Sequence, residues 1–174
     1  MTPTLYFLRS SEQKIAKDML HYAYRLDELS KTLDDVKDLE KFHTFYGLTK
    51  KDLGLYALVD NQITGAIWVR LLQDSQAPVL TIAVKPKFRN QGIGSAMMKQ
   101  LLLELGTVFE DVSVSVLANE RTVKWFENFG FKKIENSESK SPVDGLDTIS
   151  MIKNIANKEV VRPTDGYDPT RWIE

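Results

Sequence analysis

The most chemically suggestive part of the sequence is a basic loop that ends at two closely spaced glycines. The run 79–84 is apolar and rich in β-branched residues, which is typical of a buried strand. A short loop follows, and Gly92 and Gly94 then open a long stretch with a helical period of apolar residues. The charged residues of the loop are all basic: Lys85, Lys87 and Arg89.

A strand, a basic turn and a helix that begins at glycines suit the binding of a phosphate or diphosphate. The first four amides of a helix have no partner within the helix, and the aligned peptide dipoles leave positive potential there. Glycine lets an anion approach the backbone with no Cβ in the way. Two common phosphate loops are excluded: Gly94 is followed by Ser95 instead of the lysine of a nucleoside-triphosphate loop, and Met97 stands where a dinucleotide fingerprint has its third glycine.

Hydrophobic periodicity predicts the elements that position this loop. A first strand over 4–9 precedes a helix over 12–26 and a second, acidic helical stretch with an apolar stripe from Leu29 to Leu39. Asp60-Asn61-Gln62 separates two β-rich runs and indicates a hairpin. The remaining elements are expected as strands over 53–59, 63–72, 79–84, 111–117, 131–135 and 148–152, and as helices over 92–108 and 120–129.

The bulk properties describe one domain of ordinary composition. The chain has 174 residues, which we divide into a domain over 1–155 and a C-terminal extension over 156–174. A net charge of -1 gives no reason to expect a nucleic acid or a membrane surface as partner. The chain has no cysteine, which excludes a thiol nucleophile and thiolate metal sites, and no apolar stretch approaches the ~20 residues of a membrane span. These properties predict a cytoplasmic protein.

Two motifs together resemble the GNAT superfamily of acetyl-CoA-dependent N-acetyltransferases. The loop Arg89-Asn90-Gln91-Gly92-Ile93-Gly94 matches the signature Arg/Gln-x-x-Gly-x-Gly/Ala, and the strand before it resembles the strand that precedes that signature. Downstream, Asn119 and the block from Trp125 to Phe131 resemble the second conserved block of the family. The resemblance covers roughly residues 4 to 153. It implies an α/β (α+β) GNAT fold, with a mixed, mostly antiparallel sheet of seven strands flanked by about four helices.

The resemblance also implies the cofactor and its site. Acetyl-CoA is the expected co-substrate, with no metal, and a bulge is expected to splay the strand 79–84 from the strand 111–117 so that the thioester lies in the opening. The backbone N–H of Ile82 would polarise the thioester carbonyl. The residues expected to contact the cofactor are Ile82, Ala83, Val84, Arg89, Asn90, Gln91, Gly92, Ile93, Gly94, Ser95, Asn119 and Phe126.

The implied reaction is direct attack by a primary amine of a small molecule or a peptide on acetyl-CoA, with no acyl-enzyme. Glu28 is the candidate base, in the acidic stretch that begins at Asp27. Phe126 stands where the family often has a tyrosine acid, and a phenyl ring has no proton to donate; Tyr22, Tyr24 and Ser115 are the alternatives. The missing acid keeps open a second interpretation, a GNAT-fold protein that binds acetyl-CoA without catalysis, as a sensor or assembly module.

Two further expectations concern single features. Asn119 fits a helix N-cap as well as a cofactor contact. The tail contains Tyr167 and Trp172 and would either fold back on the domain or reach a neighbouring subunit, and a homodimer is compatible with such a fold.

Overall fold

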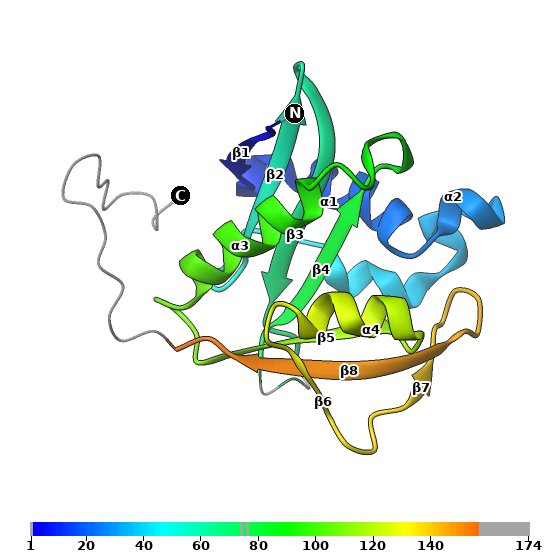
Figure 1. The fold of residues 1–174 in the computed structure, drawn as a ribbon. Coiled ribbons are helices and arrows are strands. Elements are labelled where there is room, and N and C mark those ends of the chain that lie inside the picture. Colours follow the sequence, from blue (N-terminus) through cyan, green and yellow to red (C-terminus); the bar gives the residue numbers. More distant parts are fainter. Residues whose placement is uncertain (1, 74, 76, 157–174) are drawn as a thin grey trace.

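The computed structural model describes residues 2–73, 75 and 77–156, and the extension beyond Ala156 lies outside these residues. A single eight-stranded sheet has the order β1-β2-β3-β4-β5-β8-β6, with β7 also paired to β8 (Figure 1). The strands are β1 (Thr4–Phe7), β2 (Leu53–Val59), β3 (Gln62–Arg70), β4 (Val79–Val84), β5 (Asp111–Leu117), β6 (Lys132–Lys133), β7 (Ser139–Lys140) and β8 (Asp147–Asn154). The α-helices are α1 (Gln13–Ala23), α2 (Leu26–Leu29), α3 (Ile93–Leu105) and α4 (Glu120–Glu127).

The sheet is mixed and mostly antiparallel, as predicted. Strands β1 to β4 form an antiparallel meander, and β5 pairs antiparallel with β8, so β4 and β5 are the one parallel pair among the described strands. The predicted element order is confirmed with one addition. The two-residue strand β7 was not predicted from the sequence, because Ser139 and Lys140 lie in a polar loop with no alternating apolar pattern.

The hairpin between β2 and β3 was predicted at its correct place. Its turn residues Asp60 and Asn61 have φ angles of 51° and 63°. Two consecutive left-handed residues match the twist of the flanking strands, and Asp and Asn tolerate this conformation better than other side chains do. The ladder carries one irregularity, between Ala57 and Leu58.

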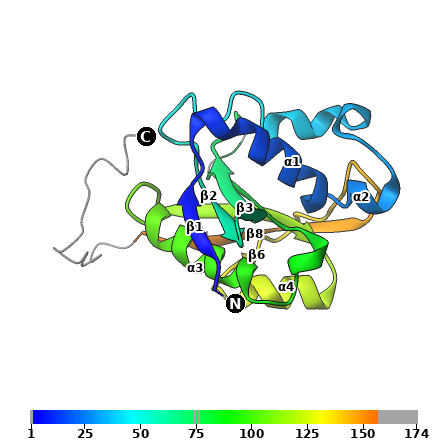
Figure 2. The same cartoon turned by 90° about the horizontal axis from the view of Figure 1, so that it is seen from above.

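Helices cover both faces of the sheet. In Figure 2, α1 and α2 lie on one side of the strands and α3 and α4 on the other. The alternation of β3 supplies both cores: Ile67 and Val69 pack beneath α3, whereas Ala66 and Trp68 pack beneath α1. A strand that is apolar on both faces is expected between two helical layers. Among the described residues, no helix combines the length and the apolar character that crossing a bilayer requires.

The acidic region after α1 departs from the prediction. The helix expected over 12–26 ends at Ala23, and Arg25 and Ser30 take left-handed φ angles of 62° and 55°. The expected second helix is instead the single turn of α2 followed by 3₁₀ turns over Leu33–Asp35 and Lys37–Phe42. The physical reason is local, because left-handed residues interrupt the helix and the amide of Thr32 donates to the Asp35 carboxylate (2.8 Å) to start a new turn.

Candidate acetyl-CoA site

The centre of the site is an opening between β4 and β5. The two strands are paired at Val79 and Ser113 alone, where the amide of Ser113 donates to the carbonyl of Pro78 (2.9 Å). Beyond this point the strands diverge around a cavity of about 580 Å³. The pairing of β4 with β3 is regular along its length. The expected opening is therefore present, but it begins where the β4–β5 ladder ends and not at a bulge in the β3–β4 ladder.

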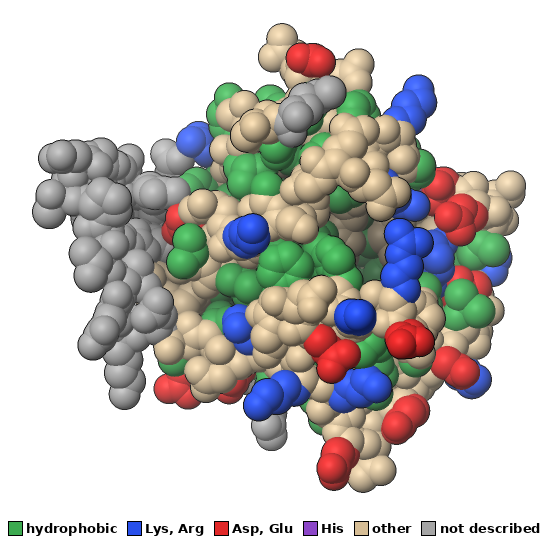
Figure 3. Space-filling model, viewed as in Figure 1, with side chains coloured by type: hydrophobic (Ala, Val, Ile, Leu, Met, Phe, Trp, Pro, Cys, Tyr) green, Lys and Arg blue, Asp and Glu red, His purple; other side chains and the backbone are tan. Residues whose placement is uncertain are grey.

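The cavity is lined from both faces of the sheet. Phe126 and Thr122 of α4 line it from one face, and Tyr24 and Phe42 line it from the other. Figure 3 shows hydrophobic side chains exposed at the centre of the face that carries α3 and α4. The cavity, which we call the passage, thus lies between the two strands and is bordered by side chains from both helical layers.

Two hydrogen bonds fix which backbone groups of β4 point into the opening. The amide of Lys85 donates to the carbonyl of Thr64 in β3 (2.8 Å), whereas the carbonyl of Pro78 accepts from β5. Successive peptide groups of a strand point to alternate edges, so odd-numbered residues of β4 face β3 and even-numbered residues face β5. The N–H of Ile82 therefore points toward the opening, and so does that of Val84.

Ala83 has a different position from its neighbours. By the same alternation its backbone groups are directed to β3, where it is paired with Ala66. Its side chain is buried in the core beneath α1. Of the three β4 residues expected to contact the cofactor, Ile82 and Val84 thus face the opening, and Ala83 supports them from the other edge of the strand.

The glycine loop exposes a row of backbone amides. Within the described part of the chain, the amides of residues 90–95 donate no hydrogen bond, and the first amide to do so is that of Ala96, to Gly92 (3.0 Å). Asn90 and Gly92 have φ angles of 63° and 84°, which turn successive amides outward. A Cβ added at Gly92 would meet no atom within 4 Å. The amides therefore form an open, positively polarised concavity at the start of α3.

Gly94 serves a different purpose from Gly92. A Cβ added there would lie 3.6 Å from Trp125 Cζ2, 3.7 Å from Val84 Cγ2 and 3.9 Å from Ile82 Cδ1. The glycine thus allows α3, α4 and β4 to approach one another. Trp125 belongs to the second sequence block, so the two motifs that are distant in the sequence meet at this point.

The remaining residues of the loop contribute charge or support. The Arg89 Nε donates to the carbonyl of Val84 (2.9 Å), which folds the exposed side chain back over the end of β4. The side-chain amide of Gln91 donates from Nε2 to the carbonyl of Lys87 (3.3 Å) and closes the turn. Ile93 is buried, so only its backbone faces the loop, and Ser95 is half-buried in the first turn of α3.

The second block supplies a helix cap and an apolar wall. The Asn119 side chain accepts from the amide of Thr122 (2.8 Å), which is the N-cap of α4. Phe126 lines the cavity and is 6% exposed. Its ring packs edge-on against Trp125, with centroids 4.9 Å apart, and against Phe131, with centroids 5.6 Å apart. An apolar ring therefore forms this part of the cavity wall.

The wall opposite α4 comes from residues that the sequence did not single out. Asp38, Lys41 and Phe42 line the cavity, together with the loop 139–142. No periodic pattern marks these residues, because they lie in irregular 3₁₀ turns and in a polar loop. Asp27 and Glu28 are exposed on α2 and do not line the cavity, so the structure does not bring the candidate base to the opening. Within the acidic stretch, Asp38 is the carboxylate that reaches it.

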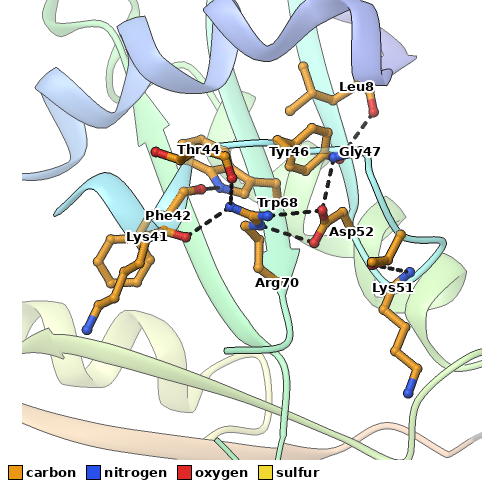
Figure 4. Close-up of polar contacts among 11 residues, drawn as sticks. Leu8, Lys41, Phe42, Thr44, Tyr46, Gly47, Lys51, Asp52, Trp68 and Arg70 are labelled. Atoms are coloured by element: carbon orange, nitrogen blue, oxygen red, sulfur yellow. Dashed lines mark hydrogen bonds and ion pairs between the residues drawn. The ribbon is translucent and has the colours of Figure 1, made fainter. Parts of the chain in front are cut away.

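Side chains of β3 hold this wall in place (Figure 4). The Arg70 guanidinium pairs with the Asp52 carboxylate (3.1 Å) and donates to the carbonyls of Lys41 (3.0 Å) and Thr44 (2.6 Å). The indole N–H of the buried Trp68 donates to the carbonyl of Phe42 (2.8 Å). Side chains of a central strand thereby hold an irregular segment by its backbone carbonyls. We call residues 41–52, together with Trp68 and Arg70, the wall anchor.

A second set of contacts joins the wall to the loop before β8. Arg25 Nε donates to the Asp144 carboxylate (3.0 Å), and Lys31 Nζ donates to the carbonyl of Val143 (2.8 Å). Burial alone would raise the pKa of Asp144, but hydrogen bonds from the Leu146 amide and from Arg25, together with the Arg25 charge, hold this pKa below its usual value. The carboxylate thus stays ionised and keeps the two segments together.

Comparison with known proteins agrees with this architecture. Residues 51–133 match the model of the acetyltransferase (GNAT) domain. Among solved structures, the ribosomal-protein-S18-alanine N-acetyltransferase from Escherichia coli has a TM-score of 0.66 at 18% identity, with 93% of this chain and 99% of that chain covered. A GNAT-family acetyltransferase from Streptococcus pneumoniae has a TM-score of 0.65 at 16% identity and covers 88% and 99% of the two chains.

A third similar structure is the chimera of Vibrio cholerae spermidine N-acetyltransferase and hSSAT. Its TM-score is 0.62 at 14% identity, with 90% of this chain and 97% of that chain covered. No curated protein matched the sequence. At such low identities the solved structures establish the fold alone. The chain thus contains a stretch, residues 51–133, that matches a GNAT acetyltransferase domain, and its described part has the fold of GNAT N-acetyltransferases.

Proposed function

We propose that the protein is an N-acetyltransferase that passes the acetyl group of acetyl-CoA directly to a primary amine of a small molecule or a peptide. The observation that carries the proposal is that two groups of backbone donors follow each other along the chain. The inward N–H of Ile82 and the open amides of residues 90–95 lie at successive positions along one strand–loop–helix segment. The N–H of Ile82 suits a carbonyl oxygen, and the amides of residues 90–95 suit a diphosphate.

In this proposal the cofactor follows that segment. The diphosphate lies on the amides of residues 90–95, with the Arg89 charge nearby. The pantetheine arm pairs with the backbone groups of Ile82 and with the amide of Val84, as an additional strand would. The thioester carbonyl then accepts from the Ile82 N–H, which stabilises the negative charge that develops on its oxygen. Phe126 closes the apolar side of the passage. Asn119 contributes by capping the start of α4.

The amine approaches from the wall formed by Tyr24, Asp38 and Phe42. An alkylammonium with a pKa near ~10.4 must first lose a proton, which costs roughly 4.6 kcal/mol at neutral pH. Asp38 is the carboxylate of the cavity, and we assign it, with water, the path by which that proton leaves. Glu28 lies outside the cavity and stays a prediction from the sequence alone.

The proposal is tested with the purified chain in two measurements. Calorimetry should detect the binding of free coenzyme A, and a thiol-release assay with acetyl-CoA should show turnover with at least one class of amine. The panel contains polyamines, free amino acids and peptides with an alanine N-terminus, because similar folds are N-acetyltransferases named for spermidine and for a ribosomal-protein alanine. An absence of both heat and competition by coenzyme A would overturn the assignment.

A second function, acetyl-CoA binding without catalysis, is favoured by one observation. Phe126 places an inert ring where the family often has its acid. A sensor of this kind would be stabilised thermally by acetyl-CoA, with the logarithm of the ligand excess over Kd, yet would release no thiol with any member of the panel. The pair of measurements above therefore distinguishes the two functions.

Two further predictions stay open to direct measurement. We infer a cytoplasmic location from the cysteine-free composition, and fractionation of cells that express the chain tests it. The second prediction is that the protein forms a homodimer, and light scattering on the full chain tests it.

A further inference from the structure

The reaction proposed above leaves a thiolate, and the usual proton donor is missing at Phe126. Given that reaction, we propose that the Tyr24 hydroxyl donates a hydrogen bond to the departing sulfur and so replaces the absent tyrosine of α4. Tyr24 is the residue just after α1, and α1 and α4 lie on opposite faces of the sheet (Figure 2). One donor can replace the other because residues from both faces line the passage between β4 and β5.

The first support is the position of Tyr24. It lines the same cavity as Ile82, whose N–H we assign to the thioester carbonyl, and as Phe126. Within the described residues, no hydrogen bond engages its hydroxyl. The group is therefore available to a ligand in the passage.

The second support is the comparison with the other candidate hydroxyls. Tyr22 lines a separate cavity of about 390 Å³, beside His21 and Lys85, and does not line the passage. Ser115 does line the passage from β5, but an aliphatic hydroxyl is a much weaker acid than a phenol. Among the hydroxyl groups named in the sequence analysis, Tyr24 combines position and acidity.

The third support is the rigidity of its surroundings. The Tyr24 ring stacks on Phe42, with centroids 5.8 Å apart and an interplanar angle of 27°. Phe42 belongs to the wall anchor, because Trp68 holds its carbonyl and Arg70 holds the carbonyls on either side of it (Figure 4). A hydroxyl on a ring that is packed in this way is held in one place, as a preorganised donor requires.

The protonation state of Tyr24 agrees with a donor that keeps its proton. Burial raises the pKa of Tyr24 to about 12, and the neighbouring Arg25 charge lowers it by less. The phenol is therefore protonated at neutral pH. Outright transfer to a thiolate, whose thiol has a pKa near ~8.5, would be strongly uphill, so the group stabilises the sulfur by hydrogen bonding.

The step balances without any further reactant. The amine nitrogen forms a bond to the carbonyl carbon, and the C–S bond breaks with its electron pair on sulfur. The proton lost by nitrogen leaves through Asp38 and water, and the thiolate takes a proton from solvent. The net products are an amide and a free thiol.

The test is the Tyr24→Phe variant in the full chain, which keeps the ring on Phe42 and removes the hydroxyl alone. We expect kcat to fall about 10- to 100-fold, with unchanged KM for acetyl-CoA and the amine and an unchanged melting temperature. Tyr22→Phe is the matched control. It makes the same change two residues earlier in the chain, at a side chain that does not line the passage, and it should leave kcat unaltered. A further variant, Tyr24→Phe with Phe126→Tyr, should recover part of the lost kcat by restoring a donor on α4.

Each outcome decides the inference. An unchanged kcat in Tyr24→Phe overturns it, and so does a loss that appears in KM for the amine or in the melting temperature, because either would indicate a packing role. If the double variant does not fold, the division of the single variant's loss between kcat and KM still decides. Wild-type protein that binds coenzyme A but turns over no amine refutes the proposed function itself and leaves Tyr24 no reaction to serve, a result distinct from turnover that is insensitive to Tyr24.

Discussion

The two sides of the passage are built in opposite ways. On the side that we propose for the cofactor, residues 79–95 form a regular strand, a short turn and the start of a helix, and the groups proposed to bind are backbone amides. On the acceptor side, residues 24–52 form short helical turns with left-handed interruptions at Arg25 and Ser30, and the functional groups are side chains. The first side takes its shape from local sequence. The second takes its shape from contacts with distant residues.

The difference indicates what each side is free to change. The diphosphate of coenzyme A is the same whatever the acceptor, so a site made of backbone amides needs only glycines and a helix start. The acceptor varies within a fold, and function is generally determined by the site and not by the fold. A segment of irregular turns, held at a few points by β3, can change its lining residues while the sheet stays the same.

The largest effect on the free energy of unfolding should follow from a substitution that breaks the ion pair in the wall anchor. Asp52→Ala removes the partner of the nearly buried Arg70 and leaves that charge unpaired, which we expect to cost about 3 kcal/mol in the free energy of unfolding. Urea unfolding measures it, with the exposed Asp34→Ala as control. If the two sides are independent, coenzyme A affinity should be preserved in folded Asp52→Ala while kcat/KM for the amine falls. Equal losses in coenzyme A affinity and in kcat/KM for the amine would contradict the independence of the two sides.

A change in the glycine loop should have a slightly smaller effect, confined to the cofactor side. Gly92→Val places a branched side chain in the amide concavity, at a φ of 84° that disfavours it, and should weaken coenzyme A binding about 100-fold, or ~2.7 kcal/mol. Gly94→Ala is the matched control, because its Cβ would make ordinary contacts with Trp125 and Val84 and the family signature admits alanine there. Titration calorimetry on folded variants compares them. Gly92→Val with native affinity would show that the amides do not bind the diphosphate.

The success of the sequence predictions follows the same division. The β2–β3 turn at Asp60 and Asn61, strand β4 and the glycine start of α3 depend on neighbours within a few residues, and all were predicted. The acidic helical stretch with the stripe from Leu29 to Leu39 is broken into short turns, because its apolar spacing could not reveal the left-handed residue at Ser30 or the Thr32–Asp35 turn.

The acceptor wall could not be predicted for a related reason. Phe42 is fixed by Trp68, and Arg25 by Asp144, and these partners are far apart in the sequence. Tyr24 was named as one of three possible donors, but the sequence held nothing to separate it from Tyr22, two residues earlier. The distinction arises only from where α1 ends beside the passage.

A smaller effect is expected at Asn119, where a structural role and a cofactor role were both predicted. Asn119→Ala removes the N-cap of α4 and should cost about 1 kcal/mol in unfolding free energy. Asn119→Ser keeps a capping oxygen and is the control. A loss of coenzyme A affinity in both variants would indicate a direct contact, whereas unchanged affinity in Asn119→Ser would assign the residue to the cap alone.

The smallest effect concerns acid stability at the acceptor wall. Because the pKa of Asp144 is lowered in the folded protein, its contribution is present above the ordinary carboxyl pKa of ~3.9 and disappears as the pH falls through the lower folded value. Asp144→Asn should therefore be less stable than wild type at pH 7 and should approach it below about pH 3. Urea midpoints measured across this range test the sign. A constant difference at all pH values would exclude the carboxylate charge as the cause.

The passage between β4 and β5 has a consequence for the order of events. Because α4 borders one side of the passage and the wall anchor the other, we expect that an amine on the side of the wall anchor need not displace a coenzyme lying along β4. Both substrates then occupy the protein together before any bond changes, and double-reciprocal plots of initial rates should intersect instead of running parallel.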